Sequence, residues 1–247
     1  MIEVESLHKS FGTAKGTVKA VDGVSFTVPD GRITGLLGPN GAGKTTTLRI
    51  LYTLLKPDQG HARVDGHDTV AAPLEVQRRI GVLPDARGLY PRLTARENIR
   101  YYGRLHGLEG NALEEGINQL IQLLDMTEIA DRRTEGFSTG ETLKVAIARA
   151  LVHGPKNVLL DEPTNGLDVM STRAMRELIR RLRDEGKSVL FSSHIMQEVA
   201  ALCEHIVVIA HGRVVAEGSP EELRRKTGQD NLEDAFVAVI GTTEGLM

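Results

Sequence analysis

The sequence is poor in the residues that crosslink small secreted proteins or bind metals through sulfur. Cys203 is the single cysteine, so no disulfide can form within the chain, and no cysteine and histidine cluster has zinc spacing. Tryptophan is absent and aromatic residues make up 4% of the 247 residues, which argues against a stacking platform for single-stranded nucleic acid. We therefore expect a buried structural thiol in a reducing compartment and no nucleic-acid partner.

Long apolar runs and a basic charge excess are also missing. No stretch approaches the ~18 apolar residues that span a bilayer, and MIEVESLHKSFG lacks the basic and then apolar layout of a signal peptide. The net charge of −3 provides no general basic field for nucleic acid. These absences predict a cytoplasmic chain, which works at a membrane only if a partner supplies the spans.

Strand-like and helical patterns alternate along most of the chain. RITGLL, RRIGVLP, NVLL and SVLFSS are typical of buried strands, and helical patterns separate them. The beginning of the chain is rich in strands, with apolar and polar residues alternating. From about 94 to 153 the pattern is helical throughout, as expected for a helical lobe inserted between two strands of a sheet. The alternation predicts an α/β fold with a mostly parallel sheet.

Local signals predict where several elements begin and end. The stretch TARE from Thr94 has capping-box spacing. A helix that begins at Lys44 is expected to continue until Pro57 stops it. Further helices are expected over 113–124 and 171–185, and IVVIAHGRVVAEG predicts a hairpin. The apolar residues of NLEDAFVAVIG fit one face of a helix, which we expect to pack against the rest of the chain.

One stretch matches a phosphate-binding loop in full. GPNGAGKT has the spacing G-x-x-x-x-G-K-[ST], with a strand pattern before it and a helix pattern after it. Glycines let backbone N–H groups converge on phosphate oxygens, and the helix start adds partial positive charge. The alternative is a purely structural glycine-rich turn. We expect Lys44 to contact the β- and γ-phosphates, Thr45 to bind Mg²⁺ and Thr46 to bind the α-phosphate. The candidate nucleotide-binding residues here are Gly38, Pro39, Asn40, Gly41, Ala42, Gly43, Lys44, Thr45 and Thr46.

Polar residues also end two other predicted strands. VLLDE ends in Asp161, which is placed to hold Mg²⁺, and Glu162, which can act as general base toward an attacking water. The alternative is a solvated acid pair that opens a turn. SVLFSSH ends at His194, whose imidazole is brought toward the same sheet edge, where ligands of such sheets bind. The other histidines are interpreted as surface or core residues.

The stretch FSTGETLK opens a helix and permits two interpretations. Ser138 and Glu141 have the spacing of a capping box, which is a structural role. A helix start with Gly140 in its first turn is also an anion site. Because the phosphate loop already supplies one helix start to the nucleotide, a second one serving the same γ-phosphate is expected to come from another copy of the chain.

Together these motifs resemble the ATP-binding subunits of ABC transporters. GPNGAGKTT corresponds to Walker A, VLLDEP to Walker B, FSTGE to the signature, NGLD to the D-loop and His194 to the switch histidine. Their order and spacing match from about 2 to 218. The resemblance implies a P-loop NTPase with a RecA-like core, an N-terminal antiparallel β subdomain and an inserted α-helical subdomain. It implies an ATPase domain over 1–225, with its helical subdomain at about 94–153, and a short helical tail over 226–247.

The same resemblance implies a head-to-tail dimer that holds two ATP molecules. Ser138 and Gly140 would contact the γ-phosphate bound by the other copy, and Asp168 would belong to the same interface. Phe11 stands at the position that stacks on adenine, although KSFG is equally compatible with core packing. The cofactors implied are ATP and Mg²⁺.

The chain departs from the family pattern at two sites. Thr139 and Glu141 replace a glycine and a glutamine of the usual signature, whereas Ser138 and Gly140 are kept. Asp85 stands where the family has the Q-loop glutamine, which reaches Mg²⁺ and the attacking water beside the membrane partner. An aspartate can still bind Mg²⁺, but it is shorter and negatively charged. Asp85 is therefore a candidate catalytic and metal-binding residue, or an ordinary turn acid after a proline.

Asp85, the following Gly-Leu-Tyr and the STG signature resemble the ATPase subunits of sodium-extruding ABC exporters. More broadly they resemble exporters that pair a small ATPase with a separate six-helix permease. We therefore expect an ATP-hydrolysing exporter subunit on the inner face of the cell membrane, with sodium, drugs, lipids or polysaccharide as cargo. The alternatives are a soluble ABC ATPase outside transport and a P-loop kinase or GTPase, of which the latter does not explain FSTGE.

Overall fold

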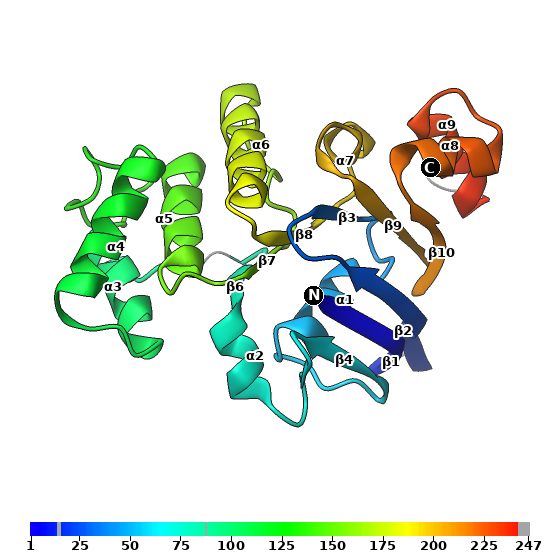
Figure 1. Cartoon of the computed structure of the whole chain (residues 1–247), viewed down its shortest axis with the longest axis horizontal. Helices are drawn as coiled ribbons and strands as arrows, with labels where there is room; N and C mark the ends of the chain where they lie inside the picture. Colours follow the sequence, from blue (N-terminus) through cyan, green and yellow to red (C-terminus); the bar gives the residue numbers. More distant parts are fainter. Residues whose placement is uncertain (14–15, 87, 242–247) are drawn as a thin grey trace.

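The computed structural model describes residues 1–13, 16–86 and 88–241, and its elements are labelled in Figure 1. The strands are β1 (Ile2–Thr13), β2 (Gly16–Val28), β3 (Ile33–Leu37), β4 (Gln59–Val64), β5 (His67–Asp68), β6 (Ile80–Leu83), β7 (Asn157–Leu160), β8 (Ser188–Ser193), β9 (His205–Ala210) and β10 (Arg213–Gly218). The helices are α1 (Lys44–Leu51), α2 (Pro73–Arg79), α3 (Ala95–Leu105), α4 (Gly110–Leu123), α5 (Thr139–Leu151), α6 (Val169–Asp184), α7 (Met196–Leu202), α8 (Pro220–Thr227) and α9 (Leu232–Ile240).

A six-stranded sheet forms the centre of the molecule. Its strand order is β10-β9-β3-β8-β7-β6, and all neighbours are parallel except the β9–β10 hairpin. The strands β3, β7 and β8 are buried along their whole length because helices or the second sheet cover both faces. The predicted mostly parallel α/β sheet is therefore confirmed.

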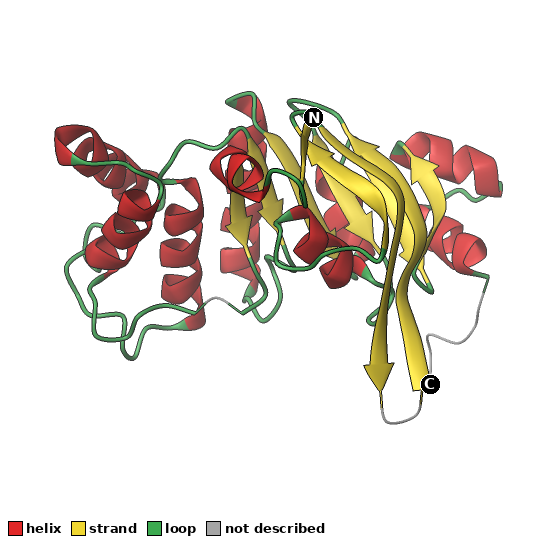
Figure 2. Cartoon of the chain, turned by 90° about the horizontal axis from the view of Figure 1, so that it is seen from below, coloured by secondary structure: helices red, strands yellow, loops and turns green. Residues whose placement is uncertain are grey.

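A second, antiparallel sheet has the order β2-β1-β4-β5. Figure 2 shows the long β1–β2 hairpin extending beyond the other strands. A core of apolar side chains joins this sheet to α1 and to one face of the six-stranded sheet, and it includes Val24, Phe26, Leu48 and Ile50. The antiparallel sheet at the beginning of the chain thus packs against α1, the helix that follows the phosphate loop.

The helices α3, α4 and α5 gather at one end of the molecule, away from α8 and α9 at the other end (Figure 1). Their inward faces join a continuous core with α6, α7 and the other face of the six-stranded sheet. Thr94 caps α3 in the predicted capping box, because its hydroxyl accepts from the Glu97 N–H and the Glu97 carboxylate accepts from the Thr94 N–H. This core couples the helical region mechanically to the sheet.

Three local predictions needed correction. The helix from Lys44 ends at Leu51 rather than near Pro57, because Thr53 adopts a left-handed conformation with φ of 67°. The arginines of RRIGVLP belong to α2 rather than to the strand, which begins at Ile80. The sequence interpretation missed α2, a short helix with Pro73 at its first position. The helix α8 was likewise not predicted, and the remaining helices lie within a few residues of the predicted ranges.

The end of the described chain packs back onto the central core. The apolar residues Leu232, Phe236 and Val239 of α9 contact that core, so the helix face predicted from NLEDAFVAVIG is confirmed as a packing face. Cys203 is 6% exposed after α7, and burial raises the pKa of its thiol well above the usual value. Among residues 1–13, 16–86 and 88–241, no helix is long and apolar enough to cross a membrane.

Candidate functional site

Four adjacent parallel strands bring together, at one edge of the sheet, the residues that are predicted to bind one ATP from within the same chain (the cis residues). In the order β3-β8-β7-β6, the strands are followed by the phosphate loop, His194, the pair Asp161 and Glu162, and Asp85. The register aligns their ends, since Leu37 pairs with Ser193 and Leu83 pairs with Leu160. The carboxyl ends of parallel strands therefore converge on one place, which is where ligands bind in open α/β sheets.

The phosphate loop connects β3 to α1 and depends on its glycines. Gly41 and Gly43 have φ values of 80° and 104°, which other residues rarely adopt. A Cβ atom at Gly43 would lie 2.3 Å from the Ala20 carbonyl oxygen, and one at Gly38 would lie 2.1 Å from the Ile209 carbonyl oxygen. The loop is thus pressed against β2 and β9, and it presents the N-terminus of α1 to the sheet edge.

Lys44, the first residue of α1, is buried, and its side chain folds back into the phosphate loop. Its Nζ atom donates to the carbonyl oxygens of Gly38 at 2.7 Å and Pro39 at 3.1 Å. It also lies 3.3 Å from Glu162 Oε1. The ammonium group is therefore fixed between the phosphate loop and the acid that ends β7, in a place where a bound triphosphate would exchange these contacts for phosphate oxygens.

The two carboxylate oxygens of Asp161 differ in their hydrogen bonding. Its Oδ1 atom accepts from Thr45 Oγ1 at 3.1 Å and from Ser192 Oγ at 2.7 Å. Its Oδ2 atom is buried and has no hydrogen-bond partner among the described residues. Burial raises the pKa of Asp161, and the Asp85 and Glu162 carboxylates add to the rise. An unpaired buried carboxylate oxygen beside a threonine hydroxyl fits a divalent cation.

The described residues contain no group of three or more His, Cys, Asp or Glu side chains that could hold a metal by themselves. A cation beside Asp161 and Thr45 would therefore take its remaining ligands from nucleotide phosphates and water. This is how Mg²⁺ is usually bound in nucleotide sites, through one or two protein ligands plus the substrate. The donor set of this site fits Mg²⁺ in that role.

Glu162 is held in an unusual backbone conformation with φ of 47°. Its N–H donates to Ser192 Oγ at 2.9 Å, and its Oε2 atom lies 3.0 Å from His194 Nδ1. A left-handed glutamate costs free energy, and such residues cluster at functional sites. The carboxylate is thereby directed between Lys44 and His194, where a water attacking the γ-phosphate would need its general base.

Asp85 stands at the exposed rim of this site. It follows Pro84 at the end of β6, beside the strand that carries Asp161. Its charge contributes to the raised pKa values of Asp161 and Tyr52, whose largest cause is burial in both cases. The structure thus brings Asp85 near the buried acid, and its expected roles in Mg²⁺ binding and catalysis stay predictions.

The signature residues are not part of this cluster. Ser138 is the N-cap of α5, with its hydroxyl accepting from the Glu141 N–H and the Glu141 carboxylate accepting from the Ser138 N–H. Asp168 is the N-cap of α6, and its carboxylate accepts from the Ser171 N–H at 2.8 Å. A Cβ atom at Gly140 would lie 3.6 Å from Ser171 Oγ, so the starts of α5 and α6 are neighbours.

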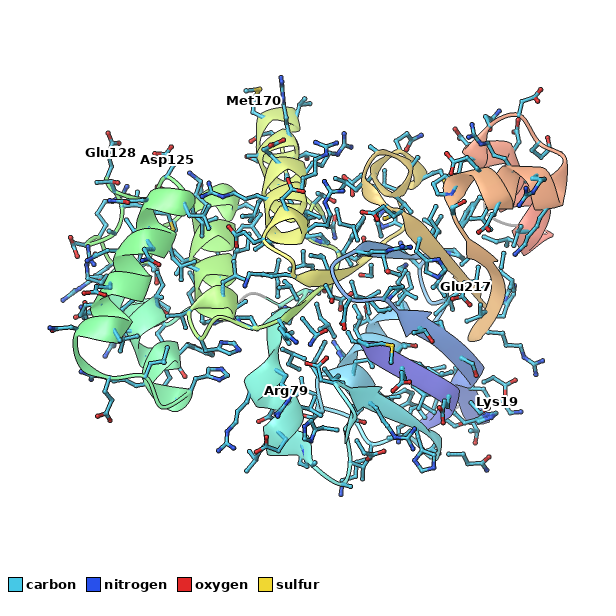
Figure 3. All side chains as sticks on the ribbon, viewed as in Figure 1. Lys19, Arg79, Asp125, Glu128, Met170 and Glu217 are labelled. Carbon is cyan, nitrogen blue, oxygen red and sulfur yellow. The ribbon has the colours of Figure 1, made fainter. Side chains whose placement is uncertain are left out.

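The side of the molecule that carries these helix starts is open. Val169 is 84% exposed, and Figure 3 shows Met170 at the outer end of α6. Met170 and Asp125 line a groove of about 450 Å³ between α4, α5 and α6. The signature therefore lies on an accessible surface, as a site that serves a second copy requires.

Phe11 lies far along the β1–β2 hairpin. It pairs with Val18 across the hairpin, it is 38% exposed, and the Lys9 ammonium lies 5.8 Å from its ring centre. The ring is not packed in the core, so an aromatic face is available for a ligand. Its stacking on adenine stays a prediction.

One residue in direct contact with the acid pair escaped the sequence interpretation. Ser192 is fully buried on β8 and contacts both Asp161 and Glu162. The only signal was the strand period of two, which places alternate residues of SVLFSS on one face. The period alone does not reveal which of the serines faces the Walker B strand, because that depends on the pairing register.

Comparison with known proteins agrees with these features. The family model described as ABC transporter matches residues 21–165, more than half of the chain. The ABC transporter ATP-binding protein NatA of Bacillus subtilis is 46% identical over 96% of this chain and 97% of its own length. The daunorubicin/doxorubicin resistance ATP-binding protein DrrA of Streptomyces peucetius is 41% identical over 94% of this chain and 69% of its own.

A solved structure extends the agreement to three dimensions. It is a dimeric ATP-binding cassette in a post-hydrolysis state bound to ADP and Pi, 25% identical, with a TM-score of 0.82 over 89% of this chain and 98% of that chain. The predicted ABC ATPase fold is thereby confirmed. The chain belongs to the ABC transporter family, as one of its ATP-binding subunits that hydrolyse ATP to ADP and phosphate.

Proposed function

We propose that the chain is the ATP-hydrolysing subunit of an ABC-2-type exporter and works as a head-to-tail dimer around two ATP molecules. The observation that carries this proposal is the division of the site. The phosphate loop, Asp161, Glu162 and His194 converge within one chain, whereas Ser138 and Gly140 lie apart on an exposed surface. Two copies arranged head to tail would complete two equivalent sites.

The cis residues divide the chemistry among them. The turn from Gly38 to Thr46 and the start of α1 bind the phosphates, with Lys44 neutralising charge on the β- and γ-phosphates. Thr45 and Asp161 would hold Mg²⁺, with Asp85 as a further ligand at the rim. Bound there, the ion would neutralise the charge that develops on the transferred phosphoryl group.

Glu162 and His194 act on the attacking water. Glu162 accepts a proton from it, and the 3.0 Å contact with His194 Nδ1 keeps the carboxylate pointed at the sheet edge. With Nδ1 donating to Glu162, the neutral imidazole has only the lone pair of its other ring nitrogen left, which can accept a hydrogen bond from the attacking water. Ser138 and Gly140 of the second copy close the site over the same phosphate, and Asp168 lies at the same junction of the two copies.

A permease would dock beside Asp85. A groove of about 640 Å³ begins at Pro84 and runs between α2 and α3, with Leu74 and Leu105 among its lining residues. Leu54, Leu74 and Leu105 are exposed apolar side chains on this face. A surface of this kind fits an amphipathic segment of a membrane partner. The chain would therefore be held on the inner face of the cell membrane through its permease.

Sodium is the cargo that we propose first. The support is the resemblance of Asp85, Gly88-Leu89-Tyr90 and the STG signature to sodium-extruding exporters. The relative DrrA, named for daunorubicin and doxorubicin resistance, supports drug export as the second candidate. No cargo contacts this subunit in such an arrangement, so the choice between them depends on the permease.

The test is transport by the assembled exporter. The chain would be purified together with its membrane partner and placed in vesicles with ATP and radioactive sodium added outside, so that subunits facing outward would move sodium into the lumen. We expect ATP to drive sodium movement, and the same preparation made with the Glu162→Gln variant to serve as the control without turnover. Sodium should raise ATPase activity above the level in potassium. Stimulation by doxorubicin but not by sodium would replace sodium with drug export, and the lack of any membrane partner would favour a soluble ABC ATPase.

A further inference from the structure

Among the residues that the structure describes, Ser192 is the one buried hydroxyl that contacts both acids at the end of β7. It has no exposed surface, and it lies on β8 two residues before His194. Leu160 pairs with Phe191 in the parallel register, so the next residue of each strand, Asp161 and Ser192, are neighbours as well. The position is thus defined by the sheet and not by a loop.

The hydroxyl makes two hydrogen bonds in opposite directions. It donates to Asp161 Oδ1 at 2.7 Å and accepts from the Glu162 N–H at 2.9 Å. The first bond, together with the bond from Thr45 Oγ1, occupies Oδ1 twice. These two bonds fix the orientation of the carboxylate. In this orientation Oδ2 is buried and has no hydrogen-bond partner among the described residues.

The second bond acts on the backbone of the general base. Glu162 has φ of 47°, a left-handed conformation that is unfavourable for a residue with a side chain. The N–H of that residue is the group that turns when φ changes. A hydrogen bond to a fully buried acceptor therefore helps to hold Glu162 in the left-handed conformation in which its carboxylate lies between Lys44 and His194.

We propose that Ser192 is a positioning residue for ATP hydrolysis: it turns Asp161 so that Oδ2 faces the metal and locks Glu162 in its left-handed conformation. Ser192 is fully buried, and in this role it acts only through these two acids. The inference rests on the proposed roles of Asp161 and Glu162. It predicts that loss of the hydroxyl lowers turnover and metal-dependent binding while leaving the phosphate loop intact.

The strand itself offers a matched control. Ser188, on the same strand and the same face, is also buried and also makes two such bonds, since its hydroxyl accepts from the Gly31 N–H at 3.1 Å and donates to Asp30 Oδ1 at 3.3 Å. It lies at the opposite end of β8 from the site. Ser188→Ala therefore removes the same kind of hydroxyl without touching the acid pair.

The experiment compares Ser192→Ala with Ser188→Ala in the full chain. We expect both variants to lose similar thermal stability. In Ser192→Ala, kcat should fall about 10- to 100-fold, as expected for loss of a buried hydrogen bond to a charged group, and KM for MgATP should rise with the loss of metal-dependent affinity. Calorimetry with a non-hydrolysable ATP analogue should show unchanged affinity in EDTA and a loss of the extra affinity that Mg²⁺ provides. Ser188→Ala should keep both.

If Ser192→Ala does not fold, Ser192→Thr and Ser192→Val replace it, because these two side chains have the same shape and only threonine keeps the hydroxyl. Thr should retain the Mg²⁺-dependent affinity and Val should lose it. Equal behaviour of Thr and Val, or of the two alanine variants, would overturn the role of Ser192. Glu162→Gln is measured alongside: if it turns over normally, the assignment of the site itself fails, whereas a dead Glu162→Gln with a normal Ser192→Ala refutes only this inference.

Discussion

The two halves of the proposed ATP site are built in different ways. The cis half, formed by the phosphate loop and the acids after β7, is connected by hydrogen bonds that link these acids to α1 and to β8. The signature half consists of helix starts whose polar groups are satisfied locally by capping bonds, as at Ser138 and Asp168. The cis half is preorganised within one chain. The signature half is a stable exposed surface that, in the proposed dimer, would bind the ATP of a second copy.

Under the proposed dimer, this difference explains how one chain can be folded and still lack half of its catalytic site. The capping box keeps Ser138 in place without a ligand, so the exposed signature costs little stability. The cis half instead contains a strained glutamate and a buried acid with a raised pKa. The proposed catalytic residues of the cis half therefore lower the stability of the fold. In the signature half, Ser138 both stabilises its helix and stands ready for the proposed phosphate contact.

The largest expected effect comes from the general base in the cis half. We expect Glu162→Gln to bind ATP normally and to slow hydrolysis at least about 100-fold, because the amide cannot take a proton from water. Because the variant would not hydrolyse the bound ATP, the closed dimer should persist. ATP with Mg²⁺ should therefore convert the variant from monomer to dimer on size-exclusion chromatography. A variant that stays monomeric under these conditions would count against both the dimer and the general base.

Mixing two inactive variants tests whether the halves belong to different chains. Lys44→Ala breaks the cis half, and Ser138→Arg blocks the signature half with a bulky cation. Each alone should lack turnover, whereas a mixture forms heterodimers with one intact site and should recover activity that rises with the fraction of mixed dimers. An inactive mixture, with both variants folded by circular dichroism, would show that the two halves do not meet across two copies.

A smaller effect is expected on stability, and it has a pH dependence. Burial raises the pKa of Asp161, so its ionised form destabilises the folded chain, fully so above the raised pKa. Asp161→Asn should therefore raise the melting temperature at pH 7.5 by a few degrees, about 2–4 °C per kcal/mol for a chain of this size. The gain should shrink as pH falls through the raised pKa toward the unfolded pKa of aspartate, because below the unfolded value the carboxyl is neutral in both states. Thermal unfolding from pH 4 to 8 measures this difference.

The sequence predicted the family, the α/β sheet and the segments that surround the site, because each of these is encoded in contiguous residues. The phosphate loop is one such segment, and the strand ending in Asp161 and Glu162 is another. Chain order also predicted that His194 would reach the same edge, since parallel strands end on one side of a sheet.

Contacts between strands were beyond the sequence interpretation. Ser192 faces the acid pair only because β7 and β8 pair in a particular register, and nothing in SVLFSS alone states that register. The helix α2 was missed because it is only two turns long and its pattern is weak. The early end of α1 follows from the left-handed Thr53, which propensity does not reveal. Such features depend on tertiary contacts that local patterns do not contain.

The single buried cysteine makes this chain well suited to site-directed labelling. Cys203 is almost inaccessible and its thiol stays protonated, so it will react slowly with maleimides. A cysteine introduced at the exposed Val169 would then be the one reactive thiol of each copy. A donor dye on one copy and an acceptor on the other would report, by energy transfer, each closing and opening of the dimer during turnover.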